Sequence, residues 1–274
     1  MLLRPLTRVF FRSSFRYRRA HRCRRLTMLA VLTIFIFLTT PFYFVYKPPQ
    51  FIIRYLQRRG PDVLWHVSTS SKVVALTIDD TPSQYTSEVV QILKENDARA
   101  TWFVIGNQVP GREKVLDELV QNGNELANHA MRDETSKSLS DDVLREQVVT
   151  VEGMIRQAYA SVDREEDFPK YFRPGGGFFN RRMQDLLARL GYRLVLGDIY
   201  PHDPFVSYWR VNARHILSML HPGGIIICHD RRSWTPPMLR EVLPKIRRQG
   251  YRIVTVTELL EEHKREMIMT SRIT

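Results

Sequence analysis

From Lys72 onward the sequence alternates short apolar runs with longer amphipathic stretches, and this alternation constrains the fold more than any other feature. The strand-like runs are Val73–Ile78, Thr101–Ile105, Tyr192–Leu196, Ile225–Cys228 and Tyr251–Val256, with shorter candidates near Leu126 and Phe172. Apolar residues recur at helical spacing over 86–96, 112–122, 141–159, 181–190, 210–220, 238–249 and 256–265. About seven strand–helix units predict an α/β fold with a parallel sheet, namely a distorted (β/α) barrel; an open doubly wound sheet is the alternative.

Polar side chains stand at the ends of five of these apolar runs. In chain order they are Asp79 with Asp80, His129 with Asp133, Arg173 with the glycines 175–177, Asp198, and His229 with Asp230. In a β/α barrel the C-terminal ends of the strands meet at one face, and that face carries the active site. The sequence therefore predicts that these residues converge on a single site.

The residue types suit metal-assisted hydrolysis. Two adjacent carboxylates at a strand end can diverge, one toward a metal ion and the other toward a water. A histidine with a second ligand four residues later can meet the same cation where the segment is tightly turned. Such ligands leave positions open on a Lewis-acidic divalent ion, and a separate histidine can protonate a leaving amine.

The motifs resemble those of the polysaccharide deacetylases, which form carbohydrate esterase family four, the NodB-homology group. The stretch from Val74 to Val109 is similar to the opening of that family, whose first motif reads TFDDGP. The later motifs follow in family order as NELANHAMRDETSKSLS, FRPGGG and GGIIICHD. The resemblance covers about residues 72–258 and indicates a divergent, chitin-deacetylase-like member.

The resemblance implies a role for each matching residue. Asp79 matches the general base, His229 the catalytic acid and Arg173 the arginine that orients the base. The remaining matches are the metal ligands Asp80 and His129, the acid-tuning carboxylate Asp198, and a backbone N–H near Gly176 and Gly177 for the oxyanion. In the implied mechanism a metal ion polarises an N-acetyl carbonyl while the base deprotonates the attacking water.

The sequence departs from the family pattern at several of these positions. Asp133 stands where the family has a second metal histidine, and the neighbouring Glu134 is a rival ligand. Gly176 replaces the loop tyrosine, which keeps a backbone N–H but removes an aromatic wall. We expect one divalent ion, Zn²⁺, with Co²⁺, Mn²⁺ and Ni²⁺ as alternatives, because a second carboxylate weakens the preference for zinc.

The formal charge of +12 belongs to the N-terminal part of the chain. Residues 1–61 contain 13 Lys and Arg and no Asp or Glu, whereas the remainder carries 28 basic and 29 acidic residues. The part predicted to fold is thus nearly neutral, and we expect no nucleic-acid partner.

An uncharged stretch over residues 26–46 follows nine arginines and is long enough to cross a bilayer as a helix. The positive-inside rule predicts a cytoplasmic N-terminus and a catalytic domain on the lumenal or extracellular side. A cleavable signal peptide and a mitochondrial presequence are the alternatives. The predicted division is a basic tail (1–25), a transmembrane signal anchor (26–46), a juxtamembrane stalk (47–71), a NodB-like deacetylase domain (72–266) and a C-terminal tail (267–274).

These observations predict a metal-dependent hydrolase that removes N-acetyl groups from amino sugars of a glycan or glycolipid. One alternative keeps the metal site and changes the substrate to another non-peptide C–N bond, in a small amide or cyclic imide. The other alternative is a catalytically inactive relative that binds glycan, for which the substitution at Asp133 is the main argument.

Overall fold

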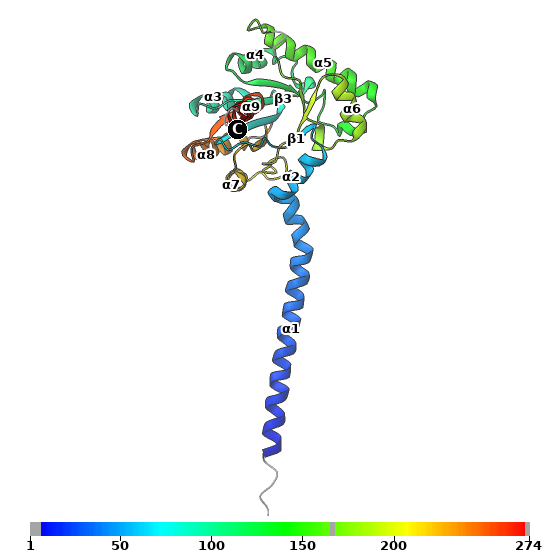
Figure 1. Ribbon diagram of the computed structural model, residues 1–274, viewed down its shortest axis with the longest axis vertical. Coiled ribbons are helices and arrows are strands. Elements are labelled where there is room, and N and C mark those ends of the chain that lie inside the picture. The colour runs from blue at the N-terminus through cyan, green and yellow to red at the C-terminus, as the bar shows by residue number, and fades with distance from the viewer. Residues whose placement is uncertain (1–6, 165–167, 272–274) are drawn as a thin grey trace, which may run out of the picture. The chain divides into compact units, whose positions relative to one another are not determined.

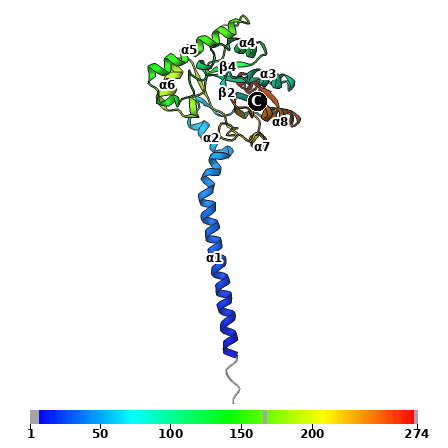
Figure 2. The same cartoon turned by 180° about the vertical axis from the view of Figure 1, so that it is seen from behind.

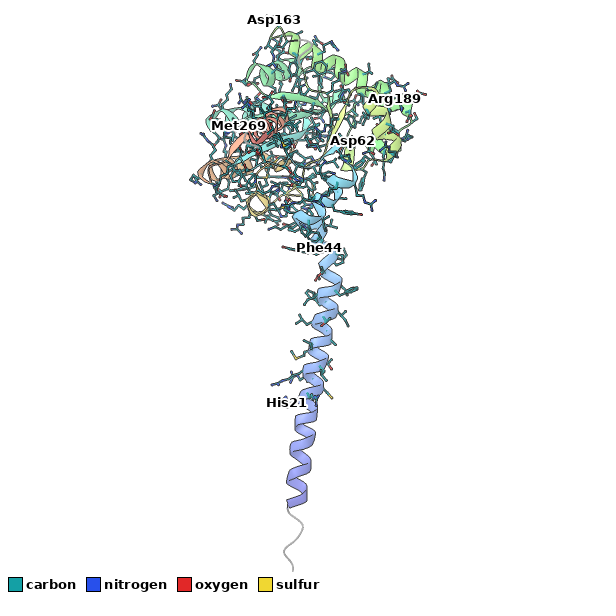
Figure 3. All side chains as sticks on the ribbon, viewed as in Figure 1. His21, Phe44, Asp62, Asp163, Arg189 and Met269 are labelled. Atoms are coloured by element: carbon teal, nitrogen blue, oxygen red, sulfur yellow. The ribbon has the colours of Figure 1, made fainter. Side chains whose placement is uncertain are left out.

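The computed structural model describes residues 7–164 and 168–271. The chain forms two compact units, Met1–Pro49 and Gln50–Thr274. The first unit contains helix α1 (Thr7–Tyr46), whose apolar side chains from His21 onward project from all sides of the helix (Figure 3). Its part from His21 to Tyr46, 26 residues long, is long and apolar enough to span a membrane, as the sequence predicts.

The second unit is built on a curled sheet in which all pairings between the described strands are parallel (Figure 1). The strands in spatial order are β1 (Val63–Leu64), β6 (Arg193–Val195), β5 (Tyr171–Phe172), β4 (Glu125–Asn128), β3 (Ala100–Val104), β2 (Val73–Thr81) and β7 (Ile225–His229), and β8 (Arg252–Val254) also pairs with β2. A bridge between Ile199 and Ile226 joins the segment after β6 to β7 and curls the sheet back on itself. The predicted distorted β/α barrel is confirmed.

Helices connect successive strands and cover the outer face of the sheet (Figures 1 and 2). They are α3 (Thr86–Glu95), α4 (Glu113–Gln121), α5 (Asp141–Ala160), α6 (Arg181–Arg189), α7 (Trp209–Met219), α8 (Thr235–Arg248) and α9 (Val256–Ser271), with short 3₁₀ turns η1 (Gly106–Gln108), η2 (Ser136–Ser138) and η3 (Gly175–Gly177). Gly123, Gly191 and Gly250 follow α4, α6 and α8 with φ of 74°, 81° and 84°, the left-handed C-cap conformation that glycine adopts without steric cost.

The two faces of β2 explain how the sheet positions the site. Val74, Leu76 and Ile78 belong to the large cluster between sheet and helices, whereas Val73 and Ala75 belong to the cluster inside the barrel. Because side chains alternate between the faces of a strand, Thr77 and Asp79 continue the inner row toward the C-terminal end. The mostly apolar strand β2 thus places the buried Asp79 carboxylate at the mouth of the barrel.

Two segment boundaries differ from the sequence prediction. The expected stalk over 47–71 contains helix α2 (Gln50–Arg59) and strand β1, which pairs with β6, so the sheet begins at residue 63 instead of 73. The pairing covers only two residues and is set by a distant strand, so local periodicity does not reveal it. At the other end, α9 continues to Ser271, beyond the predicted domain limit at 266.

Candidate active site

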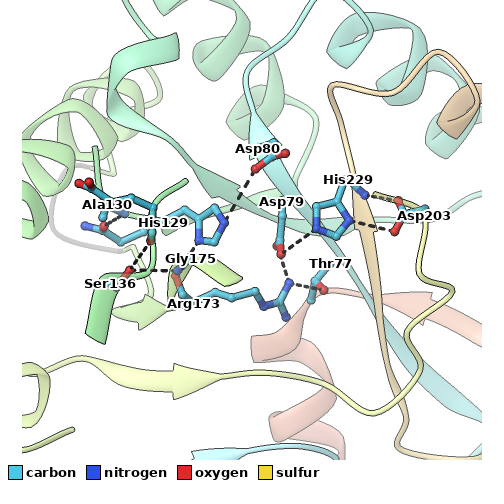
Figure 4. Close-up of polar contacts among 12 residues, drawn as sticks. Thr77, Asp79, Asp80, His129, Ala130, Ser136, Arg173, Gly175, Asp203 and His229 are labelled. Carbon is cyan, nitrogen blue, oxygen red and sulfur yellow. Dashed lines mark hydrogen bonds and ion pairs between the residues drawn. The ribbon is translucent and has the colours of Figure 1, made fainter. Parts of the chain in front are cut away.

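Asp79 lies buried at the mouth of the barrel, held by an arginine (Figure 4). The Arg173 Nη1 atom lies 2.5 Å from Asp79 Oδ1 and 2.8 Å from the Thr77 hydroxyl. Burial works to raise the pKa of the Asp79 carboxyl, but the charges of Arg173 and of nearby histidines outweigh it and hold that pKa below its usual value. Asp79 is therefore ionised, oriented, and able to accept a proton.

Arg173 is itself fixed by the barrel. Its Nε and Nη2 atoms donate to the carbonyl oxygens of Val195 and Leu196, at 3.0 and 2.7 Å, at the end of β6. Its guanidinium also stacks 4.1 Å from the centre of the Phe103 ring. These contacts fix the orientation of the guanidinium, and its hydrogen bond in turn orients the Asp79 carboxylate.

The Asp80 side chain points away from that of Asp79 because the backbone turns to the left-handed conformation at Asp80. Asp80 has φ of 63°, and the pairing of β2 with β3 shifts register between Ile78 and Thr81. The Asp80 carboxylate is 1% exposed, and neither of its oxygens has a hydrogen-bond partner in the described part of the chain. Burial raises the pKa of this carboxyl, so an ionised Asp80 requires a compensating cation.

His129 and Asp133 stand beside Asp80. One ligand atom from each of the three residues lies within 4.8 Å of the others, a spacing that fits a single metal ion. His129 Nδ1 lies 2.6 Å from the carbonyl oxygen of Arg173, which leaves Nε2 facing Asp80 at 3.9 Å. The rival Glu134 is turned away, since its carboxylate accepts from Gln147 Nε2 at 3.0 Å.

The orphaned Asp80 oxygens and the oriented imidazole fit a divalent cation. Two carboxylates and one neutral histidine give the three side chains a charge of −2, which a divalent ion balances. The sequence prediction of Asp80, His129 and Asp133 as one cluster therefore agrees with the geometry, with Asp133 on its exposed side.

His229 faces the second carboxylate oxygen of Asp79, the one that Arg173 does not bind (Figure 4). Its Nε2 atom is 3.9 Å from Asp79 Oδ2, and its Nδ1 atom is 2.9 Å from Asp203 Oδ1. Burial works to lower the pKa of His229, but the charge and hydrogen bond of Asp203, with the charges of Asp79 and Asp80, raise it to about 9. At neutral pH the imidazole is protonated and can act as an acid.

The structure corrects the sequence prediction for Asp198. Its carboxylate accepts from His221 Nε2 at 2.8 Å and from the backbone N–H of Ile225 at 3.0 Å, so it is committed to the start of β7. Asp203 takes the predicted place beside His229, where it also accepts from the His229 backbone N–H at 2.8 Å. Both aspartates follow β6, and only the path of the loop between them decides which one reaches the histidine.

The glycine loop after β5 packs against the loop that carries Asp133. A Cβ atom on Gly175 would lie 2.0 Å from the Glu134 carbonyl oxygen, so only glycine fits there. The N–H groups of Gly175 and Gly177 donate to Ser136 Oγ and to the Pro174 carbonyl, at 3.0 and 2.9 Å. Gly177 was predicted with Gly176 as an oxyanion donor, but its N–H is already used, which leaves Gly176.

An aromatic ring stands beside Gly176 although the loop lacks the expected tyrosine. The ring of Phe178 lies 3.6 Å from the position of a Cβ atom on Gly176, and it is 60% exposed. The Lys137 ammonium lies 4.9 Å from the ring centre. Sequence matching by position therefore missed an aromatic wall that the loop supplies two residues later.

Comparison with known proteins identifies relatives of this chain. The polysaccharide deacetylase family model matches residues 66–195. A peptidoglycan-N-acetylglucosamine deacetylase of Bacillus cereus is 30% identical over 204 residues, which make up 72% of this chain and 92% of that protein.

Solved structures give the same result. The peptidoglycan deacetylase PdaC from Bacillus subtilis superposes with a TM-score of 0.68 and 26% identity, covering 75% of this chain and 98% of that one. A CE4 family pseudoenzyme from Bacillus anthracis superposes with a TM-score of 0.66 and 25% identity, covering 73% and 69%. The fold is therefore shared by a protein described as a peptidoglycan deacetylase and by one described as a pseudoenzyme.

Proposed function

The chain belongs to the polysaccharide deacetylase family, carbohydrate esterase family four, and on that premise we propose that it is a metal-dependent hydrolase removing N-acetyl groups from amino sugars of a glycan or glycolipid. The observation that carries the proposal is the position of Asp79 between Arg173 and His229. The ionised base Asp79, held by Arg173, and the protonated acid His229 lie next to each other. The buried Asp80 carboxylate, which requires a cation, follows Asp79 directly. These are the groups that amide hydrolysis needs.

Asp80, His129 and Asp133 are the residues that would hold the metal ion, and we propose Zn²⁺, with Co²⁺, Mn²⁺ or Ni²⁺ as alternatives. A divalent ion supplies Lewis acidity to the acetyl carbonyl oxygen and lowers the pKa of a nearby water.

The side chains then divide the proton transfers between them. Asp79 takes a proton from the attacking water while Arg173 keeps its carboxylate aligned. In this proposal the N–H of Gly176 donates to the oxyanion as the carbonyl carbon becomes tetrahedral. His229 gives its proton to the amine nitrogen as the C–N bond breaks, and Asp203 stabilises the charged imidazole beforehand. The products are acetate and the free amino sugar.

The N-terminal helix supports a membrane location. We propose that residues 26–46, within the apolar helical stretch His21–Tyr46, anchor the chain with residues 1–25 in the cytoplasm and the catalytic unit on the lumenal or extracellular side, where glycans and glycolipid headgroups are accessible. Mitochondrial import is the alternative, since the basic N-terminus without acidic residues also suits a presequence.

An inactive glycan-binding role is favoured by the Asp133 substitution and by the likeness to a CE4 family pseudoenzyme. The complete set of Asp79, Arg173, His229 and Asp203 argues against it, because a binding protein needs neither a fixed base nor a protonated acid. Hydrolysis of another non-peptide C–N bond, in a small amide or cyclic imide, uses the same groups and differs only in the substrate.

Acetate release tests the proposal. The full-length protein in detergent is incubated with N-acetylglucosamine oligomers or an acetylated glycolipid, with zinc or cobalt added. We expect release that EDTA abolishes and that Asp79→Asn lowers by roughly 10²- to 10⁴-fold, the usual contribution of a general base. Asp185→Asn on α6 is the control, since this half-exposed aspartate forms an ion pair with Arg181 on the same helix.

The other outcomes select among the alternatives. Stoichiometric metal binding without acetate release from any glycan would favour another C–N substrate. Failure to bind a divalent metal at saturation would reject the enzyme and favour the glycan-binding relative.

A further inference from the structure

A pocket of about 310 Å³ opens beside the proposed catalytic residues. The residues of its lining that carry the argument are Pro82, Ser83, Tyr85, Gln108, Arg112 and Arg231. They come from the segments that directly follow β2, β3 and β7, and the ends of β2 and β7 carry the Asp79–Asp80 pair and His229. The pocket therefore lies at the catalytic end of the barrel.

Two contacts tie the pocket wall directly to the site. In the amide orientation that satisfies its hydrogen bonds, Gln108 Nε2 donates to the carbonyl oxygens of Asp80 and Pro82, both at 3.0 Å. Ser83 Oγ donates to Asp230 Oδ1 at 2.8 Å, and Asp230 directly follows His229. A substituent bound in this pocket could thus belong to the same substrate molecule whose acetyl group lies at Asp79.

The pocket is cationic and its charge is uncompensated. Arg112 and Arg231 are both exposed, and neither forms an ion pair with any residue that the structure describes. The Arg112 guanidinium donates a hydrogen bond to the Gln108 carbonyl oxygen at 3.3 Å. No acidic side chain is among the residues that line the pocket, and the buried Asp230 behind it accepts from the hydroxyls of Ser83 and Thr86.

We propose that this pocket binds an oxyanion of the substrate, a phosphate or carboxylate group carried by the amino-sugar glycan or glycolipid. The inference rests on the proposed deacetylase function and specifies its substrate class. Two guanidinium groups offer the planar, paired donors that match such oxyanions, and the Tyr85 ring gives an adjacent sugar an apolar face. Arg112 and Arg231 are thus specificity residues that hold one substituent while Asp79 and His229 act on the acetyl group.

Matched substrates test the inference. Full-length protein in detergent is assayed with a neutral N-acetylglucosamine oligomer, the same oligomer bearing a phosphate ester, and one bearing a lactyl carboxylate. We expect the double variant Arg112→Gln/Arg231→Gln to lose roughly tenfold or more in kcat/KM toward at least one anionic oligomer, mainly through KM, because a charge-assisted contact is removed. The neutral oligomer should change by less than about twofold. The anionic oligomer that is affected identifies the oxyanion.

The control is Arg189→Gln, an exposed arginine on α6 (labelled in Figure 3), a helix that contributes no residue to the pocket lining. It should leave all three oligomers unchanged. The double variant Arg112→Lys/Arg231→Lys should lose less than the Gln double variant. Lysine keeps the positive charge but lacks the paired N–H donors of a guanidinium group.

Two results would overturn the inference: equal losses with neutral and anionic oligomers, or no loss with either anionic oligomer. If the wild type releases acetate from none of them, the proposed function fails, and calorimetric binding of the anionic oligomers decides the inference separately. Weaker binding to the Gln double variant than to the wild type supports the anion pocket, and equal binding rejects it.

Discussion

At the scale of single residues, Asp203 sets the protonation of the proposed acid. The pKa of His229 is raised to about 9, so the imidazole is fully protonated well below that pH and loses its proton as the pH rises through it. We predict an alkaline limb in the pH–rate profile that Asp203→Asn moves to lower pH, because the main raising influence is removed. The rate at neutral pH should fall by about tenfold or more.

Asp198→Asn is the matched control for this prediction. Asp198 follows the same strand but contacts His221 and Ile225 and not His229, so its variant should leave the limb in place. A profile that moves with Asp198→Asn and stays fixed with Asp203→Asn would contradict the geometry.

The choice between Asp133 and Glu134 is also decided by single side chains. Asp133→Asn should weaken zinc binding by more than the roughly 10- to 100-fold seen when an outer partner of a ligand is lost, because it removes a ligand. Glu134→Gln should weaken it by less than about tenfold, since Glu134 accepts from Gln147. Equilibrium dialysis of both variants measures the difference, and a larger loss in Glu134→Gln would reject the assignment.

At the scale of elements, one glycine lets β1 and β7 approach. Gly223 has φ of 75°, its N–H donates to the Val73 carbonyl, and its carbonyl oxygen accepts from the Val67 N–H. A Cβ atom there would lie 1.8 Å from the Val67 carbonyl oxygen. The turn therefore joins the start of β2 and the approach to β7 to the segment that follows β1, and it cannot accommodate a side chain.

We predict that Gly223→Ala lowers the melting temperature by roughly 5–10 °C, since both backbone strain and a steric clash oppose it. Gly111→Ala is the control, because Gly111 has φ of 79° but nothing within 4 Å of its Cβ position. It should lower the melting temperature by only about 2–4 °C. Circular dichroism measures both melting temperatures. A similar decrease in the two variants would show that the contact with Val67 is unimportant.

At the scale of the whole molecule, the proposed topology puts two surfaces on opposite sides of a membrane. Cys23 is exposed at the basic end of the apolar helix, whereas Cys228 is buried and should not react. In sealed vesicles we predict that an impermeant maleimide labels Cys23 from one side and an introduced Arg189→Cys from the other. Labelling of both from the same side would exclude a membrane-spanning anchor, and cell fractionation separates the mitochondrial alternative.

The sequence by itself determined the elements and the chemistry of the site. The runs from Val73 and from Ile225 formed the expected strands, with Asp79, Asp80 and His229 at their C-terminal ends. This succeeds because apolar periodicity is a local property, and because parallel strands in a barrel bring their ends to one face. The family motifs then assigned the proposed base, the proposed orienting arginine and the candidate metal cluster to residues that stand directly at those ends.

Only the tertiary structure decided which loop residues reach the centre. Asp203 in place of Asp198, Phe178 beside Gly176, and β1 within the expected stalk all depend on loop paths or on pairing with distant segments. Arg112 and Arg231 likewise come to line one pocket from loops that are far apart in the chain. Loop conformation is set by contacts such as those of Gly175 and Gly223 with other segments, and local sequence patterns do not encode such contacts.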